Sequence, residues 1–320
     1  HLDSGWKLSF MLNALSSLQK ELAKLSIPFH ILKYEPEKPL LSNSHDFVEW
    51  FKTQCSSLSE GAKSVSVSAN AEYESDELYR DIKLLNQRDS AFEFEVHHDS
   101  CALEPCLLKT GKGSTYTLFT PWYKKWAAEV ESRIKAAKSS YILKLPELPQ
   151  LGDYFKPVKF DYDLPAEFTN YIPIVADKLP EASESAAAAL LSKFLEKKVE
   201  SYDVKDILID EGSSHLSCYL SLGIVSSRNI IYESYNKSPG GLMSKDIKKN
   251  TSLQEFVREV AWRDFYKNAI CSWPFLTMDL PFRFELNDLK WKGDEETFKK
   301  WCLGKTGVPI VDAIMRKLLN

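Results

Sequence analysis

A cluster of prolines in the middle of the chain divides it into two parts. Six of the fifteen prolines lie between Pro146 and Pro180, and proline interrupts both helices and central strands. The sequence therefore predicts a surface connection over residues 141–180, between a first domain at 1–140 and a second at 181–320. The length of 320 residues suits two domains of ordinary size.

The first part mixes the two periodicities expected of a parallel α/β layer. Leucines at helical spacing predict an opening helix, and apolar or alternating runs predict strands. Thr120 followed by Pro121 is a typical helix start. We therefore expect a Rossmann-like parallel sheet with flanking helices. The predicted elements are helices at residues 8–25, 47–55, 74–87 and from 120 onward, and strands at 29–32, 65–69 and 92–96.

The second part shows helical periodicity without strand alternation, so this domain is predicted to be all-α. Its most informative helix covers residues 253–269. One broad arc of this helix is apolar and predicts a core face. The residues on that arc are Leu253, Phe256, Val257, Val260, Ala261 and Phe265.

An acid, an indole and a phenol share the opposite arc of the same helix. These are Glu259, Trp262 and Tyr266, with Arg263 at the edge of the arc. Core packing does not require this set, whereas a cavity for a planar ligand would use flat rings beside a hydrogen-bonding carboxylate. The alternative is a helix buried on both sides, in which Glu259 and Arg263 form an ordinary i,i+4 ion pair. Spacing alone leaves both interpretations open.

A second candidate site is the segment at residues 212–217 (GSSHLS). Its glycine and serines precede an apolar helical run, so they are expected to cap a helix and leave N–H groups able to hold a phosphate. A cap that binds nothing is the alternative. Residues 304–313 lack the spacing of a P-loop. They predict only a turn that enters a helix containing Val311, Ile314, Met315 and Leu318.

Composition argues against several classes of protein. The sequence has no apolar run of about 18 residues and no secretory signal pattern. Its six cysteines never form a C-x-x-C pair, which predicts free thiols in a reducing compartment and no metal site. No G-x-G-x-x-G, H-E-x-x-H or G-x-S-x-G motif is present. The net charge of −4 argues against a wholly basic nucleic-acid binder but permits a local basic stripe.

Four segments, taken in this order, closely resemble the photolyase/cryptochrome family. Their separations match along nearly the whole chain, and the fit is best to the fungal branch of class I enzymes, which repair cyclobutane pyrimidine dimers in DNA. The resemblance implies an antenna-binding α/β domain followed by a helical FAD-binding domain. The segments are residues 119–126 (FTPWYKKW), 214–217 (SHLS, with LG at 222–223 and SR at 227–228), 259–266 (EVAWRDFY) and 306–316 (TGVPIVDAIMR).

The resemblance also implies a light-driven mechanism. In this family a reduced, light-excited FAD gives one electron to a dimer that has been flipped out of the duplex. The cofactor carries the chemistry, and the protein supplies orientation and electrostatics. The positions that match FAD-contacting residues are Tyr202, Ser213, Ser214, Leu216, Ser217 and Arg263.

On the DNA side, Glu259 matches the residue that hydrogen-bonds the pyrimidine edge, and Trp262 matches the one that packs on its rings. Lys205 is expected to contact a DNA phosphate, and Arg228 is a weaker candidate. A structure with Glu259 and Trp262 packed solid, without an opening to solvent, would refute the repair hypothesis.

On the light side, Trp291 matches the surface tryptophan that ends an electron-transfer chain to the flavin. A half-exposed packing tryptophan is the alternative. Asp76 and Glu77 match positions that hold an antenna chromophore, which we expect to be a methenyltetrahydrofolate. Ordinary solvated helix acids are the competing interpretation.

The sequence departs from the family pattern in places. His215 stands where many members carry arginine, and Ser213 where threonine is usual. We expect truncation at both ends, because the family's first strand precedes His1 and the segment that completes the flavin pocket follows Asn320. Both domains are therefore expected to be incomplete, and the chain as given to bind FAD weakly.

Two alternatives compete with dimer repair. One is a cryptochrome-like blue-light receptor without repair activity, and the other is an inactive fragment that keeps the fold. The expected partner is DNA containing pyrimidine dimers, with no membrane partner, and the chain is expected to be a monomer. Nucleus and mitochondrion are the expected locations.

Overall fold

The protein is described from a computed structural model. It describes residues 5–32, 34, 44–59, 62–137, 179–204, 212–238, 241–242, 251–290 and 293–319. The predicted connection at 141–180 therefore lies almost wholly outside the described residues, and the two domain boundaries stay predictions.

A small parallel sheet forms the centre of the α/β layer. Strand β1 (Val65–Asn70) pairs in parallel with β2 (Phe92–His97), with Val65 opposite Phe92 and Asn70 opposite His97. Side chains alternate between the two faces of a strand, and in both strands the valines, Ala69 and the phenylalanines turn to the covered face. Half-buried strands were predicted at both places, and the structure confirms them.

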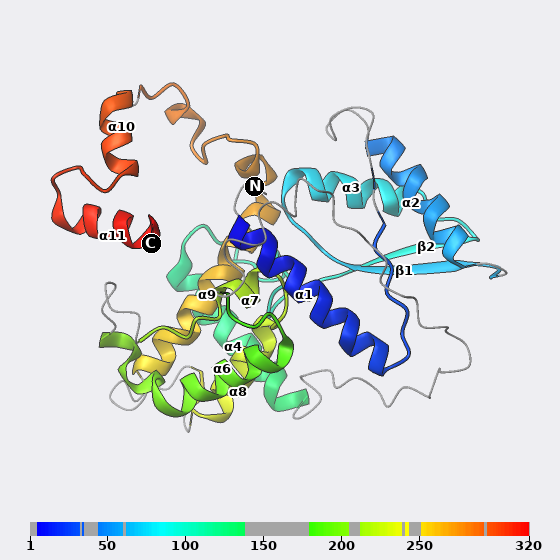
Figure 1. Cartoon of the computed structure of the whole chain (residues 1–320), viewed down its shortest axis with the longest axis horizontal. Helices are drawn as coiled ribbons and strands as arrows, with labels where there is room; N and C mark the ends of the chain where they lie inside the picture. Colours follow the sequence, from blue (N-terminus) through cyan, green and yellow to red (C-terminus); the bar gives the residue numbers. More distant parts are fainter. Residues whose placement is uncertain are drawn as a thin grey trace.

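Two helices cover the apolar face of this sheet. Helix α2 (Ser44–Leu58) contributes Val48, and α3 (Ser75–Asn86) contributes Leu84, to a cluster with Phe92 and Phe94. Figure 1 shows α2 and α3 together on one side of the two strands. The serines of β1 and the glutamates of β2 face solvent on the other side.

The strand predicted at residues 29–32 is wrong. Helix α1 (Gly5–Lys24) ends in a turn, and residues 27–32 then follow an irregular path. Among the described residues the sheet consists of β1 and β2 only. A strand exists through its ladder of hydrogen bonds to a neighbour, and residues 29–32 have no such neighbour within the part of the chain that the structure describes, although their apolar composition suits a strand.

The helical part is built around α9 (Thr251–Ser272). The helices packed around it include α4 (Phe119–Ala137), α6 (Glu184–Lys197), α7 (Ser217–Ser221) and α8 (Ser227–Asn236), together with the 3-10 turn η4 (Val199–Val204). Helix α4 begins at Phe119, so Thr120 and Pro121 lie in its first turn and do not precede it. Proline is tolerated there because first-turn N–H groups have no intrahelical partner.

The main hydrophobic core contains residues from both sides of the proline-rich connection. Trp126 and Val130 of α4 are fully buried against residues that follow the connection, including Phe194, Tyr219 and Val257. Burial of large apolar side chains is the main source of folding free energy. Helix α4 therefore precedes the connection in sequence but packs with the helices that follow it.

The last elements lie at the edge of the molecule. They are the 3-10 turns η6 (Pro274–Thr277) and η7 (Phe284–Leu286), followed by α10 (Glu295–Cys302) and α11 (Pro309–Leu319). Helix α11 is the helix predicted after the turn at 304–313. Figure 1 shows α10 and α11 (red and orange) standing apart from the helices around α9.

Candidate functional site

Helix α9 presents the two faces that its sequence predicts. All six residues of the predicted core arc, from Leu253 to Phe265, are buried. On the opposite arc Glu259 and Tyr266 are exposed, and Trp262 is partly exposed. The alternative of a helix buried on both sides is therefore wrong.

A pocket of about 610 Å³ opens beside α9. Small hydroxyl side chains, two glutamates and two cations share its wall with apolar residues. Ser221, Lys267 and Glu74 belong to this wall, although the sequence analysis did not select them. The pocket lining includes seven residues selected from the sequence: Tyr202, Ser213, Ser214, Leu216, Ser217, Glu259 and Arg263.

The serine segment does not cap a helix as expected. Helix α7 starts only at Ser217, its N-cap residue is Leu216, and no side chain caps it. Ser213 Oγ instead accepts a hydrogen bond from the His215 N–H at 3.3 Å. His215 has a left-handed backbone with φ of 55°, a conformation that is uncommon outside glycine, asparagine, aspartate and histidine. Because of this local bend, the serines lie at the pocket wall and do not cap the start of α7.

Arg263 connects the pocket to the α/β layer. Its Nη1 donates to the carbonyl of Ser100, in the loop that follows β2. Its Nη2 lies 3.5 Å from the carbonyl of Leu220 in α7. The ion pair with Glu259 that spacing permitted is not present, because the guanidinium points to these carbonyls.

Glu259 presents a free carboxylate at the pocket. Its side chain is exposed and makes no hydrogen bond or ion pair with any other residue that the structure describes. The solid packing that would have refuted the repair hypothesis is therefore not observed for Glu259. A carboxylate with unused lone pairs can accept hydrogen bonds from a ligand.

Trp262 lies outside the pocket, in a stack of aromatic rings. Its ring centroid lies 3.6 Å from that of Phe119 with an interplanar angle of 8°, and 5.5 Å from that of Tyr266 at 24°. Phe119 comes from α4, so the stack joins α4 to α9. Trp262 and Glu259 share one arc of the helix, but only Glu259 lines the pocket.

Asp264 holds α9 against the α/β layer, a role that the sequence analysis missed. This side chain is fully buried, and its Oδ2 accepts hydrogen bonds from Ala102 N at 2.8 Å and from Trp126 Nε1 at 3.2 Å. Burial raises the pKa of the Asp264 carboxyl to about 6, although these hydrogen bonds and the Arg263 charge act in the opposite direction. The sequence shows only that a single acid lies beside an otherwise apolar arc of the helix. It does not show which groups that acid contacts.

Asp76 and Glu77 lie in the first turn of α3. Asp76 is exposed and Glu77 is partly buried. The same turn contacts η6, because Ser75 N donates to Thr277 Oγ1 at 3.0 Å. The two acids therefore lie near the junction between α3 and η6.

Two further predicted residues, Lys205 and Trp291, lie outside the described residues. Arg228 is described, and its guanidinium forms an ion pair with Asp99. Burial lowers the pKa of Arg228. An arginine paired in this way is less suited to a DNA phosphate than the sequence suggested.

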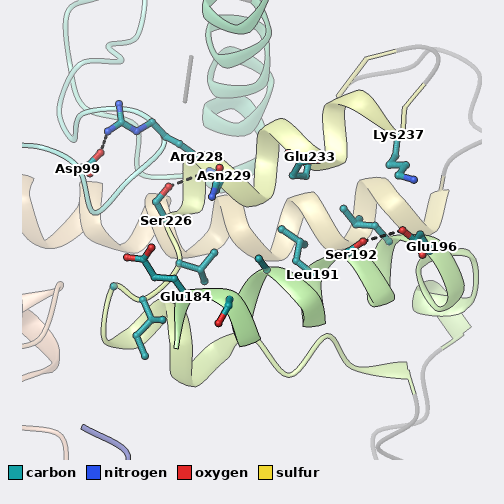
Figure 2. Close-up of a pocket in the computed structure, with 16 residues that line it drawn as sticks. Asp99, Glu184, Leu191, Ser192, Glu196, Ser226, Arg228, Asn229, Glu233 and Lys237 are labelled. Carbon is teal, nitrogen blue, oxygen red and sulfur yellow. Dashed lines mark hydrogen bonds and ion pairs between the residues drawn. The ribbon is translucent and has the colours of Figure 1, made fainter. Parts of the chain in front are cut away.

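Arg228 also borders a second cavity, of about 800 Å³, between α6 and α8. Figure 2 shows Leu191 on the α6 side of this cavity and Arg228 extending toward Asp99, which also lines it. None of the residues predicted for FAD or DNA contact lines this cavity, apart from the weak candidate Arg228.

The residues that the structure describes contain neither a metal-binding cluster nor a membrane-spanning helix. No group of three or more histidine, cysteine, aspartate or glutamate side chains there could hold a metal ion. Within the same residues, no helix has both the length and the apolar character needed to cross a membrane.

The fold is a parallel α/β layer joined to a helical unit, and a pocket rich in hydroxyl groups lies beside a central helix. Comparison with known protein families shows which class of protein has this arrangement. Residues 3–141 match the family described as DNA photolyase, and residues 256–320 match the FAD binding domain of DNA photolyase. This chain belongs to the DNA photolyase family.

Its relatives agree with that assignment. The mitochondrial deoxyribodipyrimidine photo-lyase of Saccharomyces cerevisiae is 44% identical over all of this chain and 56% of its own length. The deoxyribodipyrimidine photo-lyase of Neurospora crassa is 26% identical, over all of this chain and 51% of that protein. This chain thus spans little more than half the length of these curated relatives.

A solved structure supports the fold. The crystal structure of a bacterial class III photolyase from Agrobacterium tumefaciens matches with a TM-score of 0.66 and 20% identity. The match covers 98% of this chain and 60% of that one. The α/β layer with a helical FAD-binding part, expected from the sequence, is therefore confirmed.

Proposed function

We propose that this chain serves light-driven repair of cyclobutane pyrimidine dimers in DNA, as part of a class I photolyase of the fungal type. The observation that carries the proposal is the gathering, around one pocket of about 610 Å³, of seven residues that the sequence and its family resemblance selected. These residues come from η4, the serine segment and α9, which are separated in sequence. Chance packing of the helices would not be expected to place these particular residues around a single pocket.

The lining suits a dinucleotide such as FAD. A diphosphate needs positive charge and close backbone approach. Arg263 and Lys267 supply two cations, while Ser213, Ser214 and Ser217 leave space and offer hydroxyl groups. The buried ring of Tyr202 and the side chain of Leu216 supply the apolar surface for flat rings.

When bound and reduced, FAD would supply the light-driven electron that splits the dimer. The residues of this chain orient the reactants. Glu259 offers its carboxylate to the N–H groups of the pyrimidine edge, since no described residue competes for it. On the same arc of α9, Trp262 is partly exposed and Tyr266 is exposed, and bases extruded from a duplex are commonly held by stacking.

Further roles complete the proposal. Lys205 would contact a DNA phosphate, and Trp291 would pass electrons toward the flavin. Asp76 and Glu77 would hold a methenyltetrahydrofolate antenna at the junction of α3 and η6. Nucleus and mitochondrion are the proposed locations, and the mitochondrial name of the Saccharomyces relative supports the second of them. A monomer is the proposed state.

The proposal is tested by adding FAD to the chain and measuring binding and repair. Titration by flavin fluorescence should give saturable binding, weakened about tenfold in Arg263→Met because a cation at the diphosphate is lost. With reduced FAD in excess, the chain should split the cyclobutane dimer in an oligonucleotide under blue light, leaving the strand intact, and should not do so in darkness. Glu259→Gln should lower the rate about tenfold or more.

Glu255→Gln is the matched control for this series. Glu255 lies one turn earlier on α9, pairs with Arg258 at 2.7 Å and does not line the pocket, so it should leave repair unchanged. Saturable FAD binding without dimer cleavage would favour a cryptochrome-like receptor. The absence of both, in a folded chain, would favour an inactive fragment.

A further inference from the structure

The loop at residues 99–106 is attached to the helical part of the molecule at four points. The loop follows β2 and contains no helix or strand of its own. Each attachment joins one loop residue to a side chain of α8 or α9, and three of the four reach α9. The pairs are Asp99–Arg228, Ser100–Arg263, Ala102–Asp264 and Cys106–Asn268.

Asn268 holds the far end of this loop. Its side chain is buried, and its Oδ1 accepts a hydrogen bond from the Cys106 N–H at 2.9 Å. Cys106 has a φ of 64°, in the left-handed region that residues with a Cβ atom rarely adopt. Such conformations persist only where the surroundings hold them. The contact with Asn268 therefore supports a backbone conformation that is unfavourable by itself.

Asp264 holds the middle of the loop from the same face of α9, one helical turn before Asn268. Its Oδ2 accepts a hydrogen bond from the Ala102 N–H at 2.8 Å. Ser100 is only two residues from Ala102, so the position of the Ser100 carbonyl depends on this attachment. Both attachments to α9 use side-chain oxygens, and a substitution can therefore remove either of them singly.

The Ser100 carbonyl in turn restrains Arg263. It accepts a hydrogen bond from Arg263 Nη1, and the same arginine lines the pocket beside α9. An arginine side chain loses rotamer freedom when it grips an anion, and it loses less if it is already held before the anion binds. A chain of contacts thus runs from Asp264 and Asn268, which do not line the pocket, to a cation that does.

We propose that Asn268 and Asp264 are positioning residues for the anionic part of the ligand. They act through the loop at 99–106, whose Ser100 carbonyl holds the Arg263 guanidinium at the pocket wall. The inference rests on the proposed function, because the ligand is taken to carry a diphosphate, as FAD does. It gives the α/β layer a part in binding, although the pocket lies mainly among helices.

Asn268 is the better of the two residues for a test. Asp264 Oδ1 also lies 3.8 Å from Arg263 Nη1, so a substitution of Asp264 changes the charge beside the guanidinium directly. Asn268 is uncharged, and its described contact with the loop is the hydrogen bond from Cys106. Asn268→Ala therefore weakens the loop attachment without changing the charge beside the pocket.

The test measures the binding of inorganic pyrophosphate to the folded chain by calorimetry. Asn268→Ala should weaken binding about fivefold and Arg263→Met about tenfold. If Asn268 acts through Arg263, the double variant should also be about tenfold weaker, whereas independent effects would multiply to about fiftyfold. Ile134→Ala is the control, because Ile134 is buried in the core and does not line the pocket. It should lower stability and leave the affinity unchanged.

A second measurement needs no variant, so it stands even if Asn268→Ala fails to fold. Coupling between two binding events is reciprocal: if the loop attachment strengthens binding, the ligand must strengthen the attachment. Saturating pyrophosphate should therefore slow hydrogen exchange of the Ala102 and Cys106 amides about fivefold and leave the amides of β1 and β2 unchanged.

The outcomes separate the positioning role from the proposed function. Multiplied losses in the double variant, or loop amides that pyrophosphate does not protect, would overturn the positioning role alone. A natural chain that binds no pyrophosphate, or that binds it equally well as Arg263→Met, would overturn the diphosphate site and the positioning role together.

Discussion

Asp264 is a charged group that the fold has removed from water. Its carboxylate receives two hydrogen bonds, from Ala102 and from Trp126, yet burial still raises its pKa to about 6. Transfer of an ionised carboxylate into an apolar environment costs free energy that hydrogen bonds offset only in part. This one residue therefore makes the stability of the α9 contact depend on pH.

Asp264→Asn should remove that dependence. In the unfolded chain an aspartate titrates near 3.8, so between pH 4 and pH 6 the folded protein binds more protons than the unfolded one. Its free energy of unfolding should fall over this window as the pH rises, by up to about 3 kcal/mol from this group. Asparagine does not titrate, so the free energy of unfolding of the variant should rise relative to that of the natural chain as the pH increases over the same window. Urea unfolding at pH 4, 5, 6 and 7 measures the difference, and parallel profiles would contradict it.

At this scale the sequence predicted which residues share an arc but not which ones touch. Periodicity placed Glu259 and Trp262 together, and the family resemblance selected the serines of the pocket. The bond from Ala102 to Asp264 joins positions 162 residues apart, and no local pattern carries such information. The same limit applies to Arg228, whose partner Asp99 lies in a different part of the chain.

Among the elements, α4 and α9 make the contact on which the candidate site depends. Phe119 stacks on Trp262 at 3.6 Å between ring centroids and also lies 5.4 Å from Tyr123. Stacked aromatic pairs contribute about 0.5–1.5 kcal/mol beyond the area they bury. Phe119 therefore fixes the plane of the Trp262 ring from the side of α4.

Phe119→Leu should release the Trp262 ring. We expect a loss of about 1–2 kcal/mol in the free energy of unfolding, because one stacked partner and part of the buried surface are removed. The near-ultraviolet circular dichroism of the tryptophans should weaken at the same time. Leu118→Ala is the control, because Leu118 is 68% exposed and should change neither quantity. Equal effects of both substitutions would contradict a specific stack.

The turn between α10 and α11 depends on Gly304. Its φ is 61°, and a Cβ atom there would lie 2.9 Å from the carbonyl oxygen of Asp312. Asp312 closes the same turn by accepting hydrogen bonds from Thr306 N at 2.7 Å and Gly307 N at 3.0 Å. The glycine is therefore required both for the backbone conformation and for the close approach of α11.

Gly304→Ala should loosen α11 more than Gly307→Ala does. Gly307 also has a positive φ, of 85°, but a Cβ atom there meets nothing within 4 Å. Both changes carry the backbone cost of roughly 1 kcal/mol, and only the first adds a clash with backbone. Hydrogen exchange of the α11 amides measures the difference, and equal exchange in the two variants would contradict the clash.

Over the whole molecule, stability is unevenly distributed. The helices around α9 share one large core, whereas most side chains of α10 and α11 are exposed, including Phe298, Ile310 and Leu318. Regions with few buried apolar contacts open first. The sequence predicted α11 from its periodicity, but not this imbalance, because burial depends on what lies opposite each apolar face.

Hydrogen exchange of the intact chain should show the imbalance directly. Amides in the middle of α4 and α9 should exchange slowest, with protection close to that of global unfolding. Amides of α10 and α11 should exchange at least about tenfold faster, because their opening exposes little additional apolar surface. Uniform protection across all of these helices would contradict this picture.

Arg263 carries a consequence for how a ligand and the fold interact. A guanidinium has five N–H donors on a rigid plane, and two of them already face the carbonyls of Ser100 and Leu220. The same side chain lines the pocket, so its remaining donors can bind an anion while the α/β layer stays attached. A lysine has one nitrogen to share between both tasks. A bound ligand and the carbonyls of the α/β layer and α7 can thus use different N–H groups of Arg263.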